Sequence, residues 1–230
     1  MDLSKLEKYD SKKMYAVYDK WPEIARKSFE SKQILVDFDG IKHIIFAGMG
    51  GSGAIGDIFA SVLSKSNIHV NVIKGYVLPK TVNSDTLVIV TSVSGNTTET
   101  LSILKSAQKL NCKIIAFSSG GEMLEYCKEN KIMYRKITQY HSPRASFTSY
   151  LYTMLKVLHL TLKIKHEDIL ESIEGLKKIN KEINSLNLND CNPALKLAKW
   201  ITGITVIYYP FGLQSASIRF KNSLQENAKI

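Results

Sequence analysis

The strongest constraint on the fold is a repeated pattern: a short apolar run ends at a polar turn, and a helical repeat follows. The first copy has an apolar run at 43–47, a glycine-rich turn at 48–53, and apolar residues at helical spacing over 55–63. The second has an apolar run at 87–91 and a serine-rich turn at 92–97. Each copy predicts a strand followed by a helix, and together they predict parallel strands.

Three more short apolar runs extend this pattern, at residues 70–73, 113–117 and 132–134. With the first two runs they predict an α/β fold, an open and mostly parallel flavodoxin-like sheet of about five strands flanked by helices. Ligands of such sheets bind at the carboxyl ends of the strands. Both polar turns are expected at that edge.

The carboxyl-terminal third changes to a helical period, with apolar stripes over 151–162 and 169–183. A polar, Asn-rich stretch at 184–192 follows, and Pro193 is placed to open another helix. The run 205–209 and the helical pattern after it predict a lone βα unit, which either extends the sheet or begins a second domain. We expect a first domain at 1–165, a linking helix and polar connection at 166–192, and the start of a second domain at 193–230.

Composition limits the class of protein and its partners. Apolar residues make up 44% and charged residues 23%, as in ordinary globular proteins. Apolar runs fall short of the ~18 residues that span a bilayer, and the amino terminus lacks the apolar core of a secretion signal, so we expect a cytoplasmic protein without a membrane partner. The net charge of +10 comes from scattered lysines, which indicates a preference for anions and not a nucleic-acid partner.

Metal and disulfide sites are not expected. Cys112, Cys127 and Cys191 form no C-x-x-C pair and have no histidine at zinc-finger spacing. The predicted site therefore contains no metal, and the thiols are interpreted as buried or idle.

The glycine-rich turn matches the pattern G-x-G-x-x-G after a strand and before a helix, which is typical of dinucleotide sites. Such a site needs an acidic residue about 20 positions later to hold the ribose. Between Asp57 and Asp85 there is none. Two alternatives remain: Ser52 and the helix amino terminus attract an anionic or hydroxyl-rich ligand, or the glycines only make a tight turn and Ser52 only caps a helix.

The serine-rich turn favours the ligand-binding alternative. It offers three hydroxyls and an amide, from Ser92, Ser94, Asn96 and Thr97, at the start of a predicted helix. Hydroxyls and free backbone N–H groups can hold phosphate oxygens without a lysine. Two such turns after neighbouring strands are not explained by helix capping alone, so the sequence predicts a phosphate-containing ligand between them.

Four segments carry a family resemblance: Gly-Met-Gly-Gly-Ser-Gly at 48–53, Ser-Val-Ser-Gly-Asn-Thr-Thr-Glu-Thr at 92–100, Ser-Pro-Arg at 142–144 and Gln-Glu-Asn-Ala-Lys at 225–229. In order and spacing they resemble the bifunctional phosphoglucose/phosphomannose isomerase family, a group of SIS-domain sugar isomerases. The first two segments are shared by SIS domains generally, including regulators, and the last two narrow the resemblance. It implies an SIS-type fold over most of the chain.

The resemblance also implies roles for individual residues. Substrate-binding residues would be Gly50, Gly51, Ser52, Ser92, Ser94 and Thr97, with the hydroxyls of the second turn on the phosphate. Arg144 would stabilise the negative oxygens of an enediolate, and Glu226 would be the base that moves a proton between adjacent carbons. Without the resemblance, Arg144 would be read as a partner of a surface carboxylate and Glu226 as a solvated glutamate.

The implied activity is reversible isomerisation of glucose 6-phosphate or mannose 6-phosphate to fructose 6-phosphate, without metal or organic cofactor, in a homodimer. The family also uses a histidine after the glutamate for ring opening and a second SIS domain, and the sequence stops at Ile230 before either. We therefore expect a truncated second domain and a chain that binds phosphosugar but isomerises poorly. The alternatives are a non-catalytic SIS module that senses a phosphosugar and regulates a partner and, as a weaker option, a nucleic-acid binder.

Overall fold

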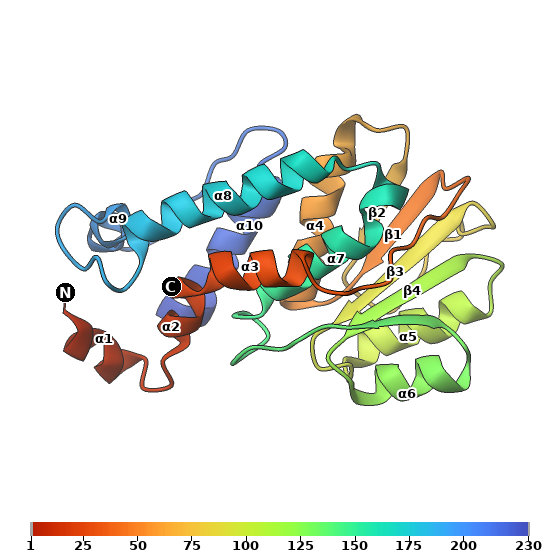
Figure 1. Cartoon of the computed structure of the whole chain (residues 1–230), viewed down its shortest axis with the longest axis horizontal. Helices are drawn as coiled ribbons and strands as arrows, with labels where there is room; N and C mark the ends of the chain where they lie inside the picture. Colours follow the sequence, from red (N-terminus) through yellow and green to blue (C-terminus); the bar gives the residue numbers. More distant parts are fainter. Residues whose placement is uncertain (1, 230) are drawn as a thin grey trace.

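The computed structural model describes residues 2–229 and contains one parallel sheet with helices on both faces (Figure 1). The strands are β1 (His43–Ala47), β2 (His69–Ile73), β3 (Thr86–Ser92), β4 (Lys113–Ser118) and β5 (Met133–Lys136), in the order β2-β1-β3-β4-β5. Every strand pair is parallel, and Ala47 of β1 is in register with Val90 of β3. The expected α/β class and open parallel sheet are confirmed.

The helices account for most of the remaining chain. They are α1 (Leu3–Tyr9), α2 (Met14–Asp19), α3 (Trp21–Phe29), α4 (Gly50–Val62), η1 (Leu63–Lys65), α5 (Thr98–Gln108), α6 (Gly121–Glu129), α7 (Phe147–Leu162), α8 (His166–Ile183), α9 (Pro193–Trp200), α10 (Gln214–Ser223) and the π-helical turn η2 (Leu224–Ala228). Asn192 caps α9 by accepting hydrogen bonds from the backbone of Ala194 and Leu195. The helix expected at Pro193 is therefore present.

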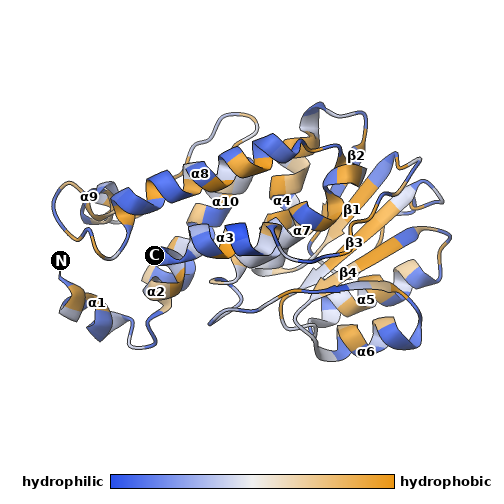
Figure 2. Cartoon of the chain, viewed as in Figure 1, coloured by the Kyte–Doolittle hydropathy of each residue, from blue (hydrophilic) through white to orange (hydrophobic). Residues whose placement is uncertain are grey.

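Helices bury both faces of the sheet, and successive residues of each strand point to opposite faces. Ile44 and Phe46 of β1 belong to the cluster shared with α4 and α7, whereas Ile45 and Ala47 belong to the cluster shared with α5 and α6. Figure 2 shows the strands as the most uniformly hydrophobic part of the ribbon. Near-continuous apolar runs are what this double burial requires.

A further layer lies outside α7, where α3 and α8 pack. Its core consists of Ala25, Phe29, Tyr152, Ile169 and Ile173, all buried. From this layer α8 runs away from the sheet to α9 at the other end of the molecule (Figure 1). The amino-terminal α1 has no buried residue.

The strand expected at residues 205–209 is wrong for this structure. The segment between α9 and α10 has no regular secondary structure, and Ile204 and Tyr208 are 96% and 92% exposed. A strand forms only where a neighbour completes its hydrogen-bonded ladder, and none adjoins this segment in the described residues. The helix after it does form, since α10 packs on α4. No helix among residues 2–229 has both the length and the apolar character to cross a bilayer.

Candidate functional site

The turn between β1 and α4 is built for close backbone approach. A Cβ on Gly48 would lie 2.9 Å from the Cβ of Ser52 and 3.0 Å from the carbonyl oxygen of Thr91, so only glycine fits there. Ser52 is buried in the first turn of α4, and the cap residue Met49 makes no side-chain hydrogen bond to that helix. Ser52 is not the helix cap, and the first amides of α4 lack a side-chain acceptor.

The turn between β3 and α5 is held by its own hydroxyls. The buried Ser92 hydroxyl shares a hydrogen bond of 2.9 Å with the Thr97 hydroxyl and accepts another from the Gly95 backbone at 3.1 Å. Ser94 is exposed, and its hydroxyl accepts from the Asn96 backbone at 3.2 Å. Ser92 therefore shapes the turn. The Ser94 hydroxyl keeps its proton for a ligand, and the Thr97 hydroxyl does so when Ser92 is the donor of the bond that they share.

The two turns lie at the same edge of the sheet. They follow adjacent parallel strands, and Ala47 and Val90, close to the ends of β1 and β3, are in register. The close approach of Gly48 to Thr91 shows that the first turn contacts β3 directly. The structure thus places the turn that carries Ser52 and the turn that carries Ser94 at the same edge of the sheet.

A third turn, between β4 and α6, is hydrogen-bonded to the serine-rich turn. The backbone of Glu122 donates to the side chain of Asn96 at 2.8 Å, and the backbone of Met123 donates to Gly95 at 2.9 Å. Gly120 and Gly121 lie in this third turn, and a Cβ on Gly121 would collide with the Ser94 carbonyl oxygen. The contacts of this turn with the serine-rich turn depend on strand order, which a single sequence does not state.

Arg144 and Glu226, the predicted catalytic residues, form an ion pair. Arg144 Nε donates to Glu226 Oε2 at 3.0 Å, and its Nη1 donates to the Asn227 side chain at 2.7 Å and to the Glu226 backbone at 3.3 Å. The two side chains are 35% and 38% exposed. The structure therefore gives Arg144 a carboxylate partner, and that partner is the proposed base.

The ion pair is connected to the serine-rich turn through α7. Arg144 precedes α7 by three positions, and Tyr150 in the first turns of this helix donates its hydroxyl to the Val93 carbonyl at 3.1 Å. Tyr150 is fully buried, and burial raises the pKa of its phenol far above the usual value, so it stays a neutral donor. One helix therefore connects Arg144 to the turn that carries Ser92 and Ser94.

Tyr18 and Arg219 surround the ion pair, and no pattern in the sequence predicts them as site residues. Arg219 Nη2 donates to the Arg144 carbonyl at 3.0 Å. Burial is the main cause that raises the pKa of Tyr18, and the nearby Arg219 lowers it. Neither residue belongs to the four recognised motifs, and their sequence neighbourhoods contain no turn or glycine signal. Only the packing of α2 and α10 around residues 142–146 identifies them.

Groups able to bind a metal do not cluster in the described chain: no set of three or more histidine, cysteine, aspartate or glutamate residues converges there. The Cys127 thiol is buried, which raises its pKa to about 11. A cavity of about 300 Å³ lies farther along α4, lined among others by Asp57, Ser61, Tyr209 and Ser215. It does not include the serine turns or the ion pair.

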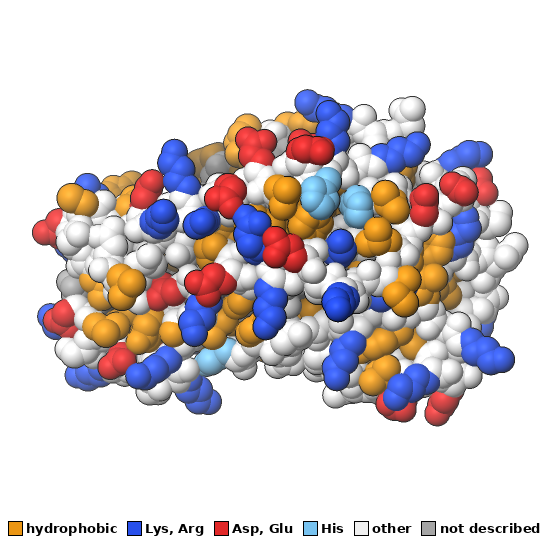
Figure 3. Space-filling model, viewed as in Figure 1, with side chains coloured by type: hydrophobic (Ala, Val, Ile, Leu, Met, Phe, Trp, Pro, Cys, Tyr) orange, Lys and Arg blue, Asp and Glu red, His pale blue; other side chains and the backbone are white. Residues whose placement is uncertain are grey.

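The surface around the fold carries mixed charges. Figure 3 shows lysine and arginine side chains interspersed with acidic ones over the visible face, without a continuous basic stripe. Several cations are paired, as in Lys74 with Asp57 at 2.6 Å and Lys105 with Glu122 at 2.9 Å. Lysine and arginine charges on the visible face are thus dispersed among acidic ones.

Comparison with known proteins gives the family. The SIS domain pattern matches residues 38–163. The chain is 32% identical over 207 residues to the bifunctional phosphoglucose/phosphomannose isomerase of Aquifex aeolicus, covering 87% of this chain and 60% of that protein. It is 30% identical over 223 residues to the D-glucosamine-6-phosphate 4-epimerase of Sulfolobus acidocaldarius, covering 94% of this chain and 66% of that protein.

A solved structure agrees with the fold. The C-terminal domain of glucosamine-fructose-6-phosphate aminotransferase from Francisella tularensis superposes with a TM-score of 0.64 at 18% identity, covering 94% of this chain and 67% of that one. The chain spans 60% to 66% of the length of the two curated relatives. The resemblance to the isomerases seen in the four motifs is confirmed. From the match over residues 38–163, the chain belongs to the SIS domain family.

Proposed function

We propose that this chain carries the phosphosugar site of a hexose 6-phosphate isomerase that interconverts glucose 6-phosphate or mannose 6-phosphate with fructose 6-phosphate. The observation that carries the proposal is the ion pair between Arg144 and Glu226, which joins residues 82 positions apart beside the helix that contacts the serine-rich turn. A module that only binds phosphosugar needs the two turns and has no use for this pair.

Substrate binding is assigned to the two turns. Ser94 and Thr97 donate to the phosphate, aided by the amino terminus of α5, and Ser92 holds their turn in shape. Gly50, Gly51 and Ser52 face the sugar chain, where the uncapped amides of α4 are available for its oxygens. This places the phosphate at one end of the site and the carbonyl end of the sugar toward Arg144.

Proton transfer is assigned to Glu226. Its carboxylate removes the C2 hydrogen of the open-chain aldose, and the electron pair forms the C1–C2 double bond while the carbonyl oxygen gains negative charge. Arg144 stabilises that charge more than it stabilises the neutral substrate. Glu226 then returns the proton to C1, and a proton moves from the oxygen on C2 to the oxygen on C1, giving the ketose. No metal or organic cofactor is required in this scheme.

The experiment separates binding from proton transfer. Fructose 6-phosphate in D2O exchanges a C1 hydrogen whenever the base acts, even if ring opening is slow, and NMR detects this exchange. Glu226→Gln should lower the exchange rate by roughly 10² to 10⁴-fold while the dissociation constant stays within about twofold. Ser94→Ala should weaken binding by roughly 10- to 100-fold, because it removes a hydrogen bond to a charged phosphate.

A matched control is Glu30→Gln, which also removes a carboxylate paired with an arginine, Arg26, far from the turns in sequence. It should leave both exchange and binding unchanged. Binding without C1 exchange in the parent chain would favour the sensor. Epimerisation of glucosamine 6-phosphate at C4 without C1 exchange would replace isomerisation by the reaction named for the Sulfolobus relative.

The finer features of the function remain part of the proposal. We expect a cytoplasmic homodimer, measurable by sedimentation equilibrium, without nucleic-acid binding. We also expect the 230 residues alone to bind hexose 6-phosphate more effectively than they turn it over. The division at residues 1–165, 166–192 and 193–230 is likewise proposed, and limited proteolysis should cut first between α8 and α9.

A further inference from the structure

The loop that carries Arg144 is held partly by its own serines and partly by side chains from other elements. Within the loop, Ser146 Oγ donates to the Tyr140 carbonyl at 2.9 Å. Residues 138–146 have no regular secondary structure, and the sheet ladder ends where the Ile137 backbone donates to the Ser118 carbonyl. Two successive carbonyls in this loop accept hydrogen bonds from distant side chains. The Arg144 carbonyl accepts from Arg219 Nη2 at 3.0 Å, and the Ala145 carbonyl accepts from Trp21 Nε1 at 2.8 Å.

The two donors come from opposite ends of the chain. Trp21 begins α3, and Arg219 lies on α10, which continues into the turn η2 that carries Glu226. Figure 1 shows the carboxyl-terminal end of the ribbon near α2 and α3, and the hydrogen bonds of Trp21 and Arg219 bring α3 and α10 together at this loop. The base and the cation of the proposed reaction are therefore held by one junction of the amino- and carboxyl-terminal helices.

Arg219 is itself held in place by aromatic side chains. Its Cζ lies 4.6 Å from the centroid of the Phe147 ring, at the start of α7. Phe147 also packs 6.3 Å from Trp21, and Trp21 contacts Tyr18 edge-on at 4.6 Å. Burial lowers the pKa of the Arg219 guanidinium, opposed mainly by Tyr18 and Glu226. Partial burial of the Arg219 charge costs desolvation free energy, which an exposed arginine on the surface does not lose.

We propose that Arg219, together with Trp21, is a positioning residue for the reaction. Arg219 holds the Arg144 carbonyl and Trp21 holds the Ala145 carbonyl, and this fixes the guanidinium of Arg144 where the enediolate charge develops. The proposal rests on the proposed function. Without these two donors the Arg144 and Ala145 carbonyls are no longer tied to α10 and α3. The loop's own hydrogen bonds, such as those from the Ala145 and Ser146 backbone to Ser142, then hold the backbone that carries the guanidinium. Misplacement by about 1 Å is enough to lose much of the stabilisation of a developing charge.

This role predicts a specific pattern of ligand affinities. Fructose 6-phosphate is neutral at its reacting carbons and is held by the serine-rich turn, so Arg219 should contribute little to its binding. A 5-phosphoarabinonohydroxamate has the planar, anionic oxygens of an enediolate and should depend on Arg144. The ratio of the two dissociation constants, measured by titration calorimetry, therefore reports the placement of Arg144 and not the integrity of the turns.

The variants are Arg219→Met, Arg219→Lys and Trp21→Phe, with Arg135→Met as the matched control. Arg135 is likewise a partly buried arginine with its pKa lowered by burial, and its Nε donates to a backbone carbonyl, that of Ile34, at 3.1 Å. We expect Arg219→Met to weaken hydroxamate binding by roughly 10- to 100-fold and fructose 6-phosphate binding by less than about twofold. Arg219→Lys should recover part of the loss, and Arg135→Met should change neither constant.

The outcomes distinguish a failure of the positioning role of Arg219 from a failure of the proposed isomerase function. A parent chain that binds both ligands equally overturns the proposed function and the inference with it. A parent that prefers the hydroxamate, with the preference retained in Arg219→Met, overturns only the inference. Equal losses for both ligands would also overturn it, since they mean a general structural role. If Arg219→Met does not fold, Trp21→Phe, which removes only the second donor, decides by the same criterion.

Discussion

The sheet and the segment 201–213 have similar residue types and opposite structures. The strand β3 is buried along its whole length between neighbours, whereas residues 205–209, also rich in β-branched and aromatic side chains, are without regular structure. Ile204, Tyr208 and Phe211 are more than nine-tenths exposed. The difference shows that strand propensity describes how well a side chain fits a half-buried pleated surface and does not create that surface.

The candidate site draws on both regions. Its serine turns are attached to buried strands, whereas Glu226 follows α10, in which Ser215 is the one residue classed as buried. Regions with few buried contacts open with a lower free energy than core regions. The half of the site proposed to bind phosphate is therefore expected to stay folded longer than the half proposed to transfer protons when the chain is destabilised.

Truncation of an aromatic side chain in each region tests the contrast most strongly. Phe59 is fully buried and stacks on Phe46 at a centroid distance of 4.9 Å, so Phe59→Ala should cost about 3–5 kcal/mol of unfolding free energy. Tyr208→Ala, at a site that is 92% exposed, should change it by less than about 0.5 kcal/mol. Urea titrations followed by circular dichroism give both values. Similar losses would mean that the segment is packed in solution.

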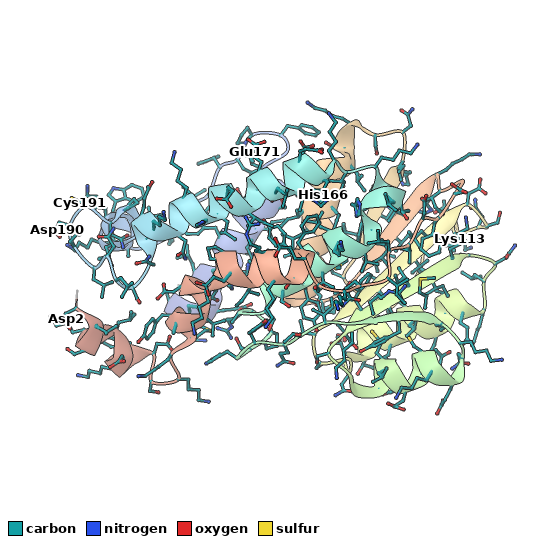
Figure 4. The ribbon with its side chains drawn as sticks, viewed as in Figure 1. Asp2, Lys113, His166, Glu171, Asp190 and Cys191 are labelled. Atoms are coloured by element: carbon teal, nitrogen blue, oxygen red, sulfur yellow. The ribbon has the colours of Figure 1, made fainter. Side chains whose placement is uncertain are left out.

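Thiol reactivity tests the same contrast without changing the core. Burial raises the pKa of Cys127 in α6 to about 11, so at pH 8 roughly one molecule in a thousand carries its thiolate. Cys191 is exposed on the connection between α8 and α9, at the end of the molecule away from the sheet (Figure 4). Iodoacetamide should modify Cys191 at least about 100-fold faster, as measured by peptide mass mapping. Equal rates would show that α6 opens readily.

Features that depend on local patterns could be predicted from the sequence, whereas features that depend on contacts with distant segments could not. The apolar runs at 43–47 and 113–117 gave the positions of β1 and β4 closely, because burial on both faces leaves a continuous apolar signal. The run at 205–209 has the same signal, and it lacks a partner in the described chain. Ser52, Ser94, Arg144 and Glu226 are candidates predicted from motifs, whereas Arg219 belongs to none of those motifs.

The reason for the last miss is geometric. The contact of Arg219 with the Arg144 carbonyl spans 75 positions and exists only because α10 packs on α4 beside the start of α7. No spacing rule connects an arginine in an amphipathic helix with a loop so far away. A residue that holds a site by donating to a distant backbone carbonyl is in general not predicted by sequence motifs.

Two glycines with positive φ sharpen the comparison at the level of the backbone. Gly95 in the serine-rich turn has φ +76°, and a Cβ there would collide with the Gly120 carbonyl. Gly203 in the exposed segment has φ +65° and nothing within 4 Å. Both alanine variants pay backbone strain of about 1 kcal/mol or more, and Gly95→Ala adds a collision, so we expect it to lose about 2–3 kcal/mol and most fructose 6-phosphate affinity. Equal unfolding free energies for the two variants would contradict the tight contact between the turns.

The helix α8, which joins the two regions, gives the smallest and oppositely signed effect. Only Ile169 and Ile173 of its 18 residues are buried, so its stability depends on intrinsic helix propensity more than that of the helices on the sheet. Gly175 lies in its interior with open space around the Cβ position. Gly175→Ala should raise the unfolding free energy by about 0.5–1 kcal/mol, because alanine loses less backbone entropy in a helix. A loss of stability in the same urea titration would mean that α8 bends or packs at Gly175 and that the connection between the regions is not a plain solvent-exposed helix.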